Sequence, residues 1–213
     1  TIDDWMGIMN DDIKVFTQSS IRITNNDLVI YVDPYGIDND YNDADFVLIT
    51  HSHYDHFSLK DIAKVRKGST KFIIPKDLDG KLDNYIILLP GEEYDDEYIK
   101  IKTIPAYNID KPYHKREYGW LGYIVEINNT TYYFAGDTDC TKEAISVKCD
   151  VAFVPIGGTY TMDYMEAARL INIIKPNVAI PIHYGSIVGS YDDADKFKKY
   201  VNKDIMVDIR LKK

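Results

Sequence analysis

The sequence predicts an α+β fold in which β-sheets are covered by helices. Short runs rich in apolar and β-branched residues, each bounded by turn residues, recur along the chain and indicate strands. Helical periodicity appears clearly in only three segments between these runs. With 213 residues and 45% hydrophobic content, the chain suits one compact domain that spans residues 1–213 and can surround an internal site.

The predicted strands are Ile13–Phe16, Ser20–Thr24, Leu28–Val32, Phe46–Thr50, Lys71–Ile74, Ile86–Leu89, Ile99–Ile104, Gly122–Ile127, Tyr132–Ala135, Val151–Pro155, Val178–Pro181 and Ile205–Ile209. Turns at Asn25-Asn26 and Asn128-Asn129 predict hairpins, because Asn tolerates the left-handed backbone that tight turns need. The predicted helices are Leu59–Arg66, Tyr164–Ile174 and Ala194–Tyr200. Asp163 and Glu166 have the spacing of a capping box, which predicts the start of the second helix.

The charge pattern disfavours nucleic acid and membranes as partners. The formal net charge is −9, and no long Lys/Arg run is present to follow a phosphate backbone. No segment offers ~18 consecutive apolar residues for a membrane span, and Thr1–Met6 lacks the basic and apolar regions of a signal peptide. Cys140 and Cys149 do not form a C-x-x-C pair, which fits a reducing cytoplasm. The positive segment Lys111–Arg116 fits either a solvated loop or the approach of a small anionic substrate.

A cluster of histidines with one aspartate follows a predicted buried strand. The strand ends abruptly at His51-Ser-His-Tyr-Asp-His56, which holds three of the chain's five histidines. If the backbone stays extended, His51 and His53 point the same way, whereas Asp55 and His56 need a turn that brings them beside a second point. Imidazole and carboxylate ligands favour Zn, Mn or Fe over Ca, and the shortage of thiolates argues against a closed structural zinc site. The hexapeptide therefore predicts ligands for two neighbouring metals.

The hexapeptide resembles the His-x-His-x-Asp-His signature of the metallo-β-lactamase superfamily. One residue before it, Asp33, and two after it, Asp137 and His183, follow the order that this superfamily shows. Asp33 in Val-Asp-Pro resembles a structural aspartate that orients the histidine loop. Asp137 in Ala-Gly-Asp-Thr resembles the carboxylate that bridges two metals, and His183 in Pro-Ile-His-Tyr-Gly resembles the final histidine ligand. Four motifs are similar to a bacterial and archaeal branch related to ascorbate-6-phosphate lactonase: Gln18–Arg22, Pro105–Asn108, Pro155–Met162 and Ile182–Gly185.

This resemblance implies a four-layer αβ/βα sandwich, in which two mixed β-sheets pack face to face with helices outside. It also implies a hydrolase that uses a metal-bound hydroxide to cleave a small substrate, either a phosphorylated compound or a lactone or ester. Two Zn²⁺ sites are expected, with Mn²⁺ or Fe²⁺ as alternatives. Asp55 is expected to bind metal and also to act as a catalytic residue that orients or deprotonates the attacking water. The expected ligands are His51, His53, Asp55, His56, Asp137 and His183.

The sequence departs from the superfamily pattern at the third histidine of the first metal. Asn108 stands where that histidine is expected, and Asn is a weak ligand for a transition metal. His114 has three interpretations: a ligand of the first metal, a catalytic residue that contacts substrate or transfers a proton, or an uninvolved surface histidine. Gln18 stands where related sequences often have His, and fits either a strand-end polar group or a pocket residue. Cys140 fits a small buried residue better than a thiolate ligand.

Other functions remain open at this point. The Asn108 departure also fits a degenerate metal-binding or sensing module without hydrolytic activity. A phosphodiesterase or nuclease is disfavoured by the acidic charge and by a length that leaves no room for a large inserted domain. The segment Gly157–Thr161 fits either an anion-binding turn or an ordinary turn before the next helix. Hydrolysis of a small molecule in the cytoplasm, with a homo-oligomer as one option for assembly, is the leading interpretation.

Overall fold

The computed structural model describes residues 12–213. The expectation that Thr1–Met6 is not a signal peptide therefore lies outside the described residues. The strands are β1 (Ile13–Val15), β2 (Ile21–Asn25), β3 (Leu28–Val32), β4 (Ala44–Leu48), β5 (Arg66–Ile74), β6 (Tyr85–Ile87), β7 (Glu93–Asp95), β8 (Lys100–Pro105), β9 (Leu121–Ile127), β10 (Thr130–Phe134), β11 (Val151–Pro155), β12 (Val178–Ile182) and β13 (Met206–Val207). The α-helices are α2 (Leu59–Val65), α3 (Tyr164–Ile174) and α4 (Asp192–Tyr200), and the short 3-10 helices are η1 (Lys76–Leu78), η2 (Arg116–Tyr118) and η3 (Ala144–Ser146). Within residues 12–213, no helix combines the length and the apolar character that a bilayer span requires.

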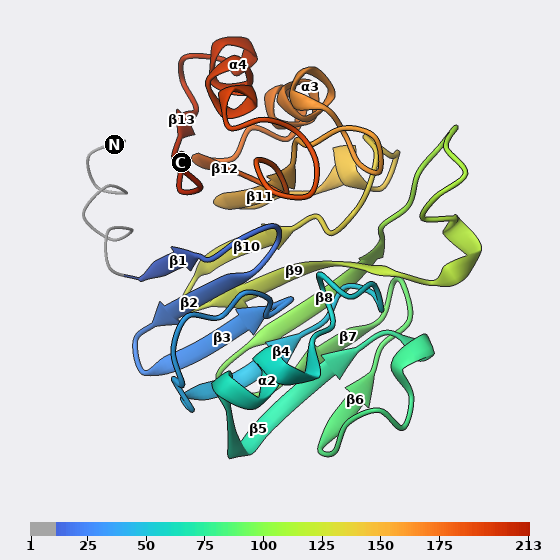
Figure 1. Cartoon of the computed structure of the whole chain (residues 1–213), viewed down its shortest axis with the longest axis vertical. Helices are drawn as coiled ribbons and strands as arrows, with labels where there is room; N and C mark the ends of the chain where they lie inside the picture. Colours follow the sequence, from blue (N-terminus) through green and yellow to red (C-terminus); the bar gives the residue numbers. More distant parts are fainter. Residues whose placement is uncertain (1–11) are drawn as a thin grey trace.

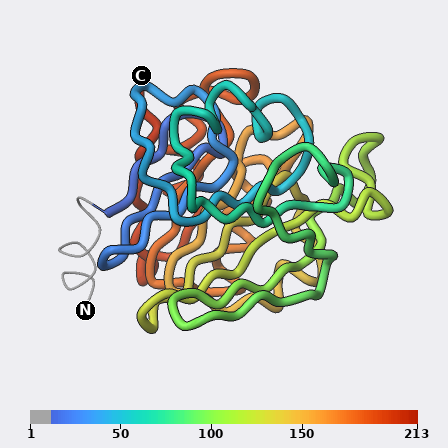
Figure 2. Tube along the Cα trace, turned by 90° about the horizontal axis from the view of Figure 1, so that it is seen from below, coloured from blue at the N-terminus to red at the C-terminus, as the bar shows by residue number. Residues whose placement is uncertain are grey.

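The strands form two mixed β-sheets. One sheet has the order β1-β2-β3-β4-β5-β6, and the other has the order β13-β12-β11-β10-β9-β8-β7. Each sheet combines antiparallel and parallel neighbours; in the first, β2 and β3 are antiparallel whereas β3 and β4 are parallel. The blue-to-teal strands of the first sheet lie against the green-to-orange strands of the second (Figure 2). Apolar side chains from both sheets fill the space between them, including Ile30 and Leu48 from one and Phe134 and Phe153 from the other.

Helices cover the outer faces of the sheets. On the first sheet, α2 packs Ile62 and Val65 against the face that carries Val47 and Phe72. On the second sheet, α3 and α4 lie beside β11 and β12 (Figure 1). Helix α3 buries residues at i, i+3, i+4 and i+7, the spacing of one helix face: Ala167, Leu170, Ile171 and Ile174. The layers are therefore helix, sheet, sheet and helices, and the predicted α+β sandwich is confirmed.

The ends of several elements differ from the sequence prediction. Asp163 caps α3 as predicted, because its carboxylate accepts hydrogen bonds from the backbone amides of Met165 and Glu166 at 2.9 Å each. The reciprocal half of the capping box is wrong, since the Glu166 carboxylate accepts from the backbone amide of Cys140 instead. The first hairpin turns one residue later than predicted, because Asn25 still pairs with Leu28 in the ladder.

Apolar periodicity does not predict β7, and it places the start of β5 too late. Strand β7 is Glu-Tyr-Asp on the edge of its sheet, so it has no apolar run to signal it. Strand β5 begins at Arg66, directly after α2, and its first residues are polar. Helix α4 begins at Asp192 rather than Ala194, because acidic residues in a first turn interact favourably with the helix dipole.

The two sheets bring several strand ends to one edge of the sandwich. Parallel strands β3 and β4 end just before Asp33 and the histidine hexapeptide, while β10 and β12 end just before Asp137 and His183. Tyr123 of β9 joins the sheets here. Its hydroxyl donates to the main-chain carbonyl of Ile49, which follows β4, at 2.5 Å and to that of Ile73, in β5, at 3.2 Å.

Candidate metal centre

The hexapeptide leaves β4 and folds at once into a tight turn. The backbone amides of His56 and Phe57 both donate to the carbonyl of His53, at 2.9 and 2.8 Å. This turn separates the side chains as predicted, because His51 and His53 reach one group of polar atoms whereas Asp55 and His56 reach another.

Four side chains form the first group of candidate ligands. The donor atoms of His51, His53, His114 and Asp137 lie within 4.8 Å of one another. Nε2 of His51 is 3.1 Å from Nδ1 of His53 and 3.7 Å from Oδ2 of Asp137, and Nε2 of His114 is 3.2 Å from the same oxygen. The Trp120 ring packs against all three imidazoles, at centroid distances of 4.7, 4.8 and 5.4 Å, and His53 is the exposed member of the group.

Asn108 holds His114 in place and does not itself join the group. Its Oδ1 is 3.2 Å from Nδ1 of His114, and its backbone amide donates to the His114 carbonyl at 2.8 Å. With Nδ1 donating to an amide oxygen, the imidazole keeps the lone pair on Nε2, which faces the group. The surface interpretation of His114 is wrong, because the residue is only 2% exposed. Asn108 engages Nδ1, whereas Nε2 has no hydrogen-bond partner and faces the group, which favours a ligand over a proton carrier.

Three side chains form the second group, namely Asp55, His56 and His183. Oδ2 of Asp55 is 3.4 Å from Nε2 of His56 and 3.5 Å from Nε2 of His183. All three residues are buried. Asp137 also borders this group, since its Oδ1 is 3.4 Å from Nε2 of His56 and its Oδ2 is 3.4 Å from Nε2 of His183. Every histidine of the chain therefore lies in one of the two groups, and Asp137 lies between them.

Asp33 orients the hexapeptide through contacts with Thr50 and His56. Its Oδ1 accepts from the backbone amide of Thr50 at 2.8 Å, and its Oδ2 accepts from the Thr50 hydroxyl at 2.6 Å. The same Oδ2 is 2.7 Å from Nδ1 of His56, which directs Nε2 of that ring toward the second group. The Thr50 hydroxyl is also 2.9 Å from Nδ1 of His51. These contacts agree with the predicted role of Asp33 in orienting the histidine loop, and Asp33 is not among the candidate ligands.

Opposite charges stabilise one another inside this buried cluster. Burial opposes ionisation of Asp137, but the positive charges of His183 and His56 hold its pKa well below the usual range. Burial likewise opposes protonation of His183, yet nearby carboxylates, chiefly Asp137, raise its pKa to about 9. In contrast, burial and the charge of His56 lower the pKa of His51 well below its usual value. Protons on the second group therefore balance the carboxylates, and a bound cation would replace them.

The backbone is left-handed at four non-glycine residues around the cluster. The φ angles are 49° at Gln18, 47° at Asp33, 43° at His114 and 57° at His183. This conformation costs roughly 1–2 kcal/mol per residue, and such strain persists only where the surrounding structure imposes it. The strain at these positions indicates that the fold holds their side chains in place.

The donor atoms and their spacing fit transition-metal ions. For metal–ligand bonds of about 2.1 Å, two ligands at a tetrahedral angle lie about 3.4 Å apart, and the contacts in the two groups range from 3.1 to 3.7 Å. Among the residues that the structure describes, Nε2 of His56, Nε2 of His114 and Oδ1 of Asp137 are buried without a hydrogen-bond partner. Buried polar atoms without partners are costly, and cations between the groups would satisfy all three.

His114 is carried by a segment, residues 108–119, that we call the arm and that projects from the body of the molecule (Figures 1 and 2). Asp139, which is 4% exposed, anchors its base. Oδ1 of Asp139 accepts from the Asn108 amide at 3.2 Å and from the Lys111 ammonium group, and Oδ2 accepts from the backbone amide of Ile109 at 2.8 Å. No motif in the sequence indicates this role; the only hint is the position of Asp139 two residues after Asp137.

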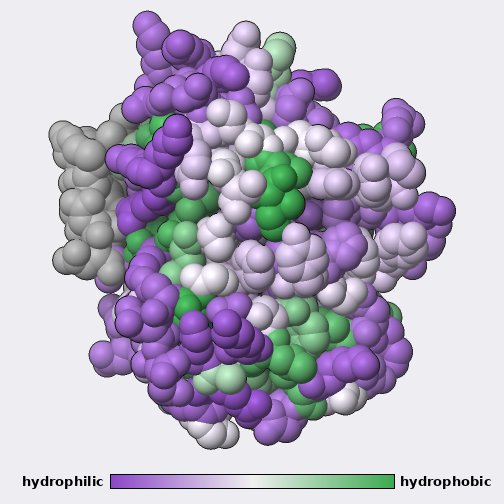
Figure 3. Space-filling view, viewed as in Figure 1, coloured by the Kyte–Doolittle hydropathy of each residue, from purple (hydrophilic) through white to green (hydrophobic). Residues whose placement is uncertain are grey.

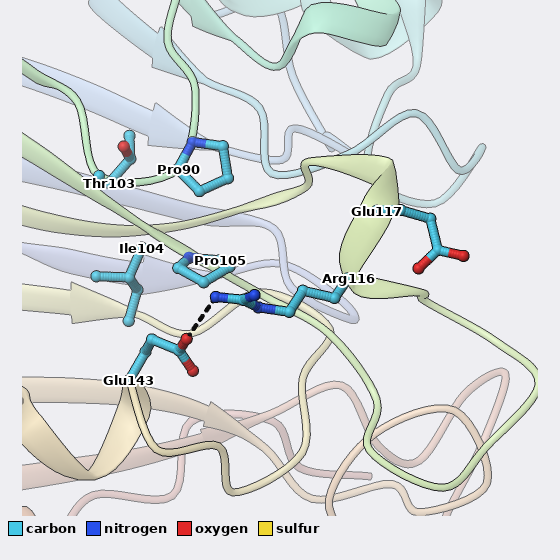
Figure 4. A pocket seen from close by; sticks show the side chains of 8 residues that line it. Pro90, Thr103, Ile104, Pro105, Arg116, Glu117 and Glu143 are labelled. Atoms are coloured by element: carbon cyan, nitrogen blue, oxygen red, sulfur yellow. Dashed lines mark hydrogen bonds and ion pairs between the residues drawn. The ribbon is translucent and has the colours of Figure 1, made fainter.

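A second contact ties the arm to η3 at the surface. Arg116 donates to the Glu143 carboxylate at 2.9 Å, and the Tyr107 hydroxyl donates to the same carboxylate at 2.9 Å. Figure 4 shows Arg116 and Glu143 pointing toward one another across a surface pocket of about 570 Å³. The residues that line this pocket, such as Pro90 and Pro105, belong to neither group of candidate ligands.

Two further features of the sequence have structural roles. In the segment Gly157–Thr161, the backbone amides of Gly158, Tyr160 and Thr161 donate to carbonyls of the same turn, which favours an ordinary turn over an anion site. Cys140 is half-buried and belongs to neither group of candidate ligands, and burial raises the pKa of its thiol. The preference for a structural Cys140 over a thiolate ligand therefore agrees with its surroundings.

Comparison with known proteins gives the family. The β-lactamase superfamily domain matches residues 12–183. A UPF0173 metal-dependent hydrolase from Pyrococcus furiosus is 31% identical over 184 residues, which cover 79% of each chain. Another from Nanoarchaeum equitans is 30% identical over 217 residues, which cover 92% of this chain and 99% of that protein. The crystal structure of a protein described as a metal-dependent hydrolase, from Parabacteroides distasonis, has a TM-score of 0.83 and 32% identity, and covers 94% of this chain and 93% of the other.

The narrower relation to ascorbate-6-phosphate lactonase stays a prediction. The matches above span the histidine hexapeptide, Asp137 and, for the domain, His183 at its last matched residue. The chain belongs to the β-lactamase superfamily and is a relative of its UPF0173 metal-dependent hydrolases.

Proposed function

We propose that this metal-dependent hydrolase uses two metal ions to cleave a small ester, lactone or phosphorylated substrate. The observation that carries the proposal is the position of Asp137, whose oxygens lie 3.2–3.7 Å from donor atoms of both groups. A carboxylate with this placement can bind one cation with each oxygen. Zn²⁺ is the proposed ion in both sites, because neutral imidazole and carboxylate are ligands that it prefers.

The proposed ligands divide as the two groups do. His51, His53 and His114 hold the first metal, while Asp55, His56 and His183 hold the second, with Asp137 shared. Metals held there would lower the pKa of water to about 7 and so supply a nucleophile without Ser or Cys. Trp120 packs against the buried imidazole of His51, and the low exposure of that ring strengthens electrostatic interactions there.

Asp55 has a second proposed role as a catalytic residue. Burial would raise the pKa of its carboxyl group, but the nearby imidazoles of His183 and His56 outweigh burial and lower the pKa below its usual value. An ionised carboxylate of low basicity is better suited to accept a hydrogen bond from the attacking water than to remove a proton from that water. Asp55 is therefore proposed to bind metal through one oxygen and to orient the water through the other.

The surroundings of the cluster support a small substrate with an anionic part. Tyr54 and Tyr113 are the chain neighbours of Asp55 and His114, and they are 65% and 43% exposed. They offer aromatic surface to a bound molecule. Beside the arm, Lys115 and Lys142 line a pocket of about 460 Å³. Their charges stand out in an acidic chain and would favour a phosphate or carboxylate group on the substrate.

A degenerate module without hydrolytic activity is not favoured. That alternative arises from Asn108, which stands in the place of a ligand histidine. In the structure, His114 supplies an imidazole to the first group and Asn108 orients that imidazole. The first group therefore still has three imidazoles and a carboxylate, although Asn108 stands in the place of a ligand histidine.

Metal content and hydrolysis test the proposal together. The purified chain is expected to bind two Zn²⁺ by elemental analysis and to hydrolyse at least one compound in a panel of lactones, esters and phosphodiesters. Asp55→Ala is expected to abolish hydrolysis, and His114→Ala is expected to lose one metal. Glu117→Gln, an exposed change in the arm, serves as the control with wild-type metal content. Two bound metals in His114→Ala would contradict the assigned ligand, and metal binding without any hydrolysis would favour the non-enzymatic alternative.

A further inference from the structure

Gln18 is the only glutamine of the chain, and its side chain is directed into the protein beside the second group. It lies between β1 and β2 and has no exposed surface. The interpretation of Gln18 as a strand-end polar group is therefore wrong. Its carbonyl accepts from the backbone amide of His183 at 2.9 Å, so two residues with left-handed backbone, at φ angles of 49° and 57°, are bonded to each other.

The end of the Gln18 side chain meets two proposed ligands of the second metal. Nε2 of Gln18 is 3.4 Å from Oδ2 of Asp55 and 3.5 Å from Nε2 of His183. The same two ligand atoms are 3.5 Å apart, and Nε2 of His56 is 3.4 Å from the Asp55 oxygen. The amide thus stands at the distance from these atoms that separates neighbouring ligands on one metal, about 3.4 Å at a tetrahedral angle.

The direction of the amide matters, because only its oxygen can bind a cation. The NH₂ group points at Asp55, and the carbonyl oxygen is buried without a hydrogen-bond partner. Rotation by half a turn exchanges oxygen and nitrogen without changing the shape of the group. That rotation gives up one long hydrogen bond of 3.4 Å to Asp55 and a contact of 3.5 Å with Nε2 of His183. A cation beside Asp55 and His183 would repel the NH₂ group and attract the oxygen.

We propose that Gln18 is a ligand of the second metal and binds it through its side-chain oxygen. This inference rests on the proposed two-metal function. It adds a fifth side chain to the set of Asp55, His56, His183 and Asp137, from a part of the chain that precedes all of them. A neutral amide oxygen is a harder ligand than imidazole, so it shifts the preference of the second site toward Mn²⁺ or Fe²⁺ relative to the first site.

Two substitutions distinguish an oxygen ligand from a hydrogen-bond donor. Gln18→Glu keeps the length of the side chain and presents only oxygen atoms. If Gln18 is an oxygen ligand, this change strengthens the metal contact. If the amide only donates to Asp55, the new carboxylate repels Asp55 and weakens metal binding. Gln18→Leu removes both functions. Asn128→Asp adds the same negative charge in the β9–β10 turn, at the opposite end of β10 from Asp137, and controls for net charge. The probes are Zn²⁺ and Mn²⁺, each titrated against a chelator into the metal-free full chain.

The expected result is opposite effects at the second metal and no effect at the first. Gln18→Glu is expected to tighten one of the two Mn²⁺ ions, the one at the second site, by ~10-fold, and Gln18→Leu is expected to weaken the same ion by ~10- to 100-fold. In the Co²⁺-loaded protein, Gln18→Leu is expected to change the visible absorption bands of one ion, because its coordination number falls. Thermal denaturation of the metal-free variants checks that each one folds.

Weaker binding in Gln18→Glu would overturn the inference, since it would mean that the amide donates a hydrogen bond to Asp55. Unchanged binding and unchanged Co²⁺ bands in Gln18→Leu would overturn it as well. The wild-type titration separates this failure from failure of the proposed function. A wild-type chain that binds only one metal refutes the two-metal proposal and removes the role of Gln18 with it, whereas two metals with unaffected variants refute Gln18 alone.

Discussion

Removal of the Asp139 carboxylate is expected to release His114 from the first metal without unfolding the protein. Asp139→Ala takes away the acceptor for Asn108, Ile109 and Lys111 at the base of the arm. Hydrogen bonds to a charged group contribute about 1.5–3 kcal/mol each. The Lys111 side chain is 29% exposed, so water replaces its bond. The two bonds from Asn108 and Ile109 remain as the local loss, about 3–6 kcal/mol before relaxation.

Part of this loss is expected to appear in the affinity for metal. Asn108 both bonds to Asp139 and orients His114, so a displaced Asn108 no longer directs the imidazole toward the first group. Loss of such an orienting contact weakens metal binding by about 10- to 100-fold, or about 1.4–2.7 kcal/mol. Titration of metal-free Asp139→Ala with Zn²⁺ against a chelator measures both sites, and the second site is expected to keep its wild-type affinity.

The matched control changes the other anchor of the same arm. Glu143→Gln removes the charge that pairs with Arg116, a residue whose side chain is 58% exposed. An exposed ion pair contributes about 0–1 kcal/mol, so this variant is expected to bind both metals as the wild type does. Wild-type affinity at the first site in a folded Asp139→Ala protein would show that the arm does not depend on this carboxylate. Equal weakening in both variants would show that any disturbance of the arm suffices.

Three further outcomes are expected. Tyr123→Phe leaves the Ile49 carbonyl without its donor, while the Ile73 carbonyl keeps the bond from the Ile49 amide. The substitution is expected to lower the free energy of unfolding by about 1–3 kcal/mol, measured by urea denaturation; equal stability would exclude a role for this contact between the sheets. Gly157→Ala places a methyl group 2.3 Å from the His183 carbonyl oxygen and is expected to weaken the second metal more than ~10-fold, whereas Gly68→Ala, with open space around it, is a neutral control. Because the pKa of His183 is raised to about 9 without metal, binding at pH 7 displaces its proton. His56, whose pKa is also raised well above its usual value, releases a proton as well. The apparent affinity of the second site is therefore expected to rise at least tenfold per pH unit from pH 7 toward 9, and a pH-independent titration would contradict this.

The local part of the site is predictable from the sequence. In the hexapeptide, His51 and His53 are two residues apart and point the same way, and a turn of a few residues redirects Asp55 and His56. These relations depend on neighbours in the chain, so spacing alone indicates them. The same holds for α3, whose apolar spacing and capping residue Asp163 determine its bounds.

The remaining part depends on contacts between distant segments. His114 reaches the first group because Asp139, far along the chain, holds the arm through Asn108. Gln18 meets the second group because its backbone bonds to that of His183. Neither contact leaves a periodic or compositional pattern, so the sequence leaves His114 with three interpretations and Gln18 with two. Strand β7 escapes prediction for a related reason, since an edge strand with polar residues has no apolar run.

The placement of the candidate ligands at the edges of two different sheets bears on how the protein matures. His51 to His56 extend from the first sheet, whereas His114, Asp137 and His183 extend from the second. A metal shared by both sets joins parts of the chain that are far apart in sequence, and it finds no complete site until the sheets have docked. Metal uptake is thus expected to be a late step of folding, and the bound ions would then resist separation of the sheets much as a cross-link closes a long loop.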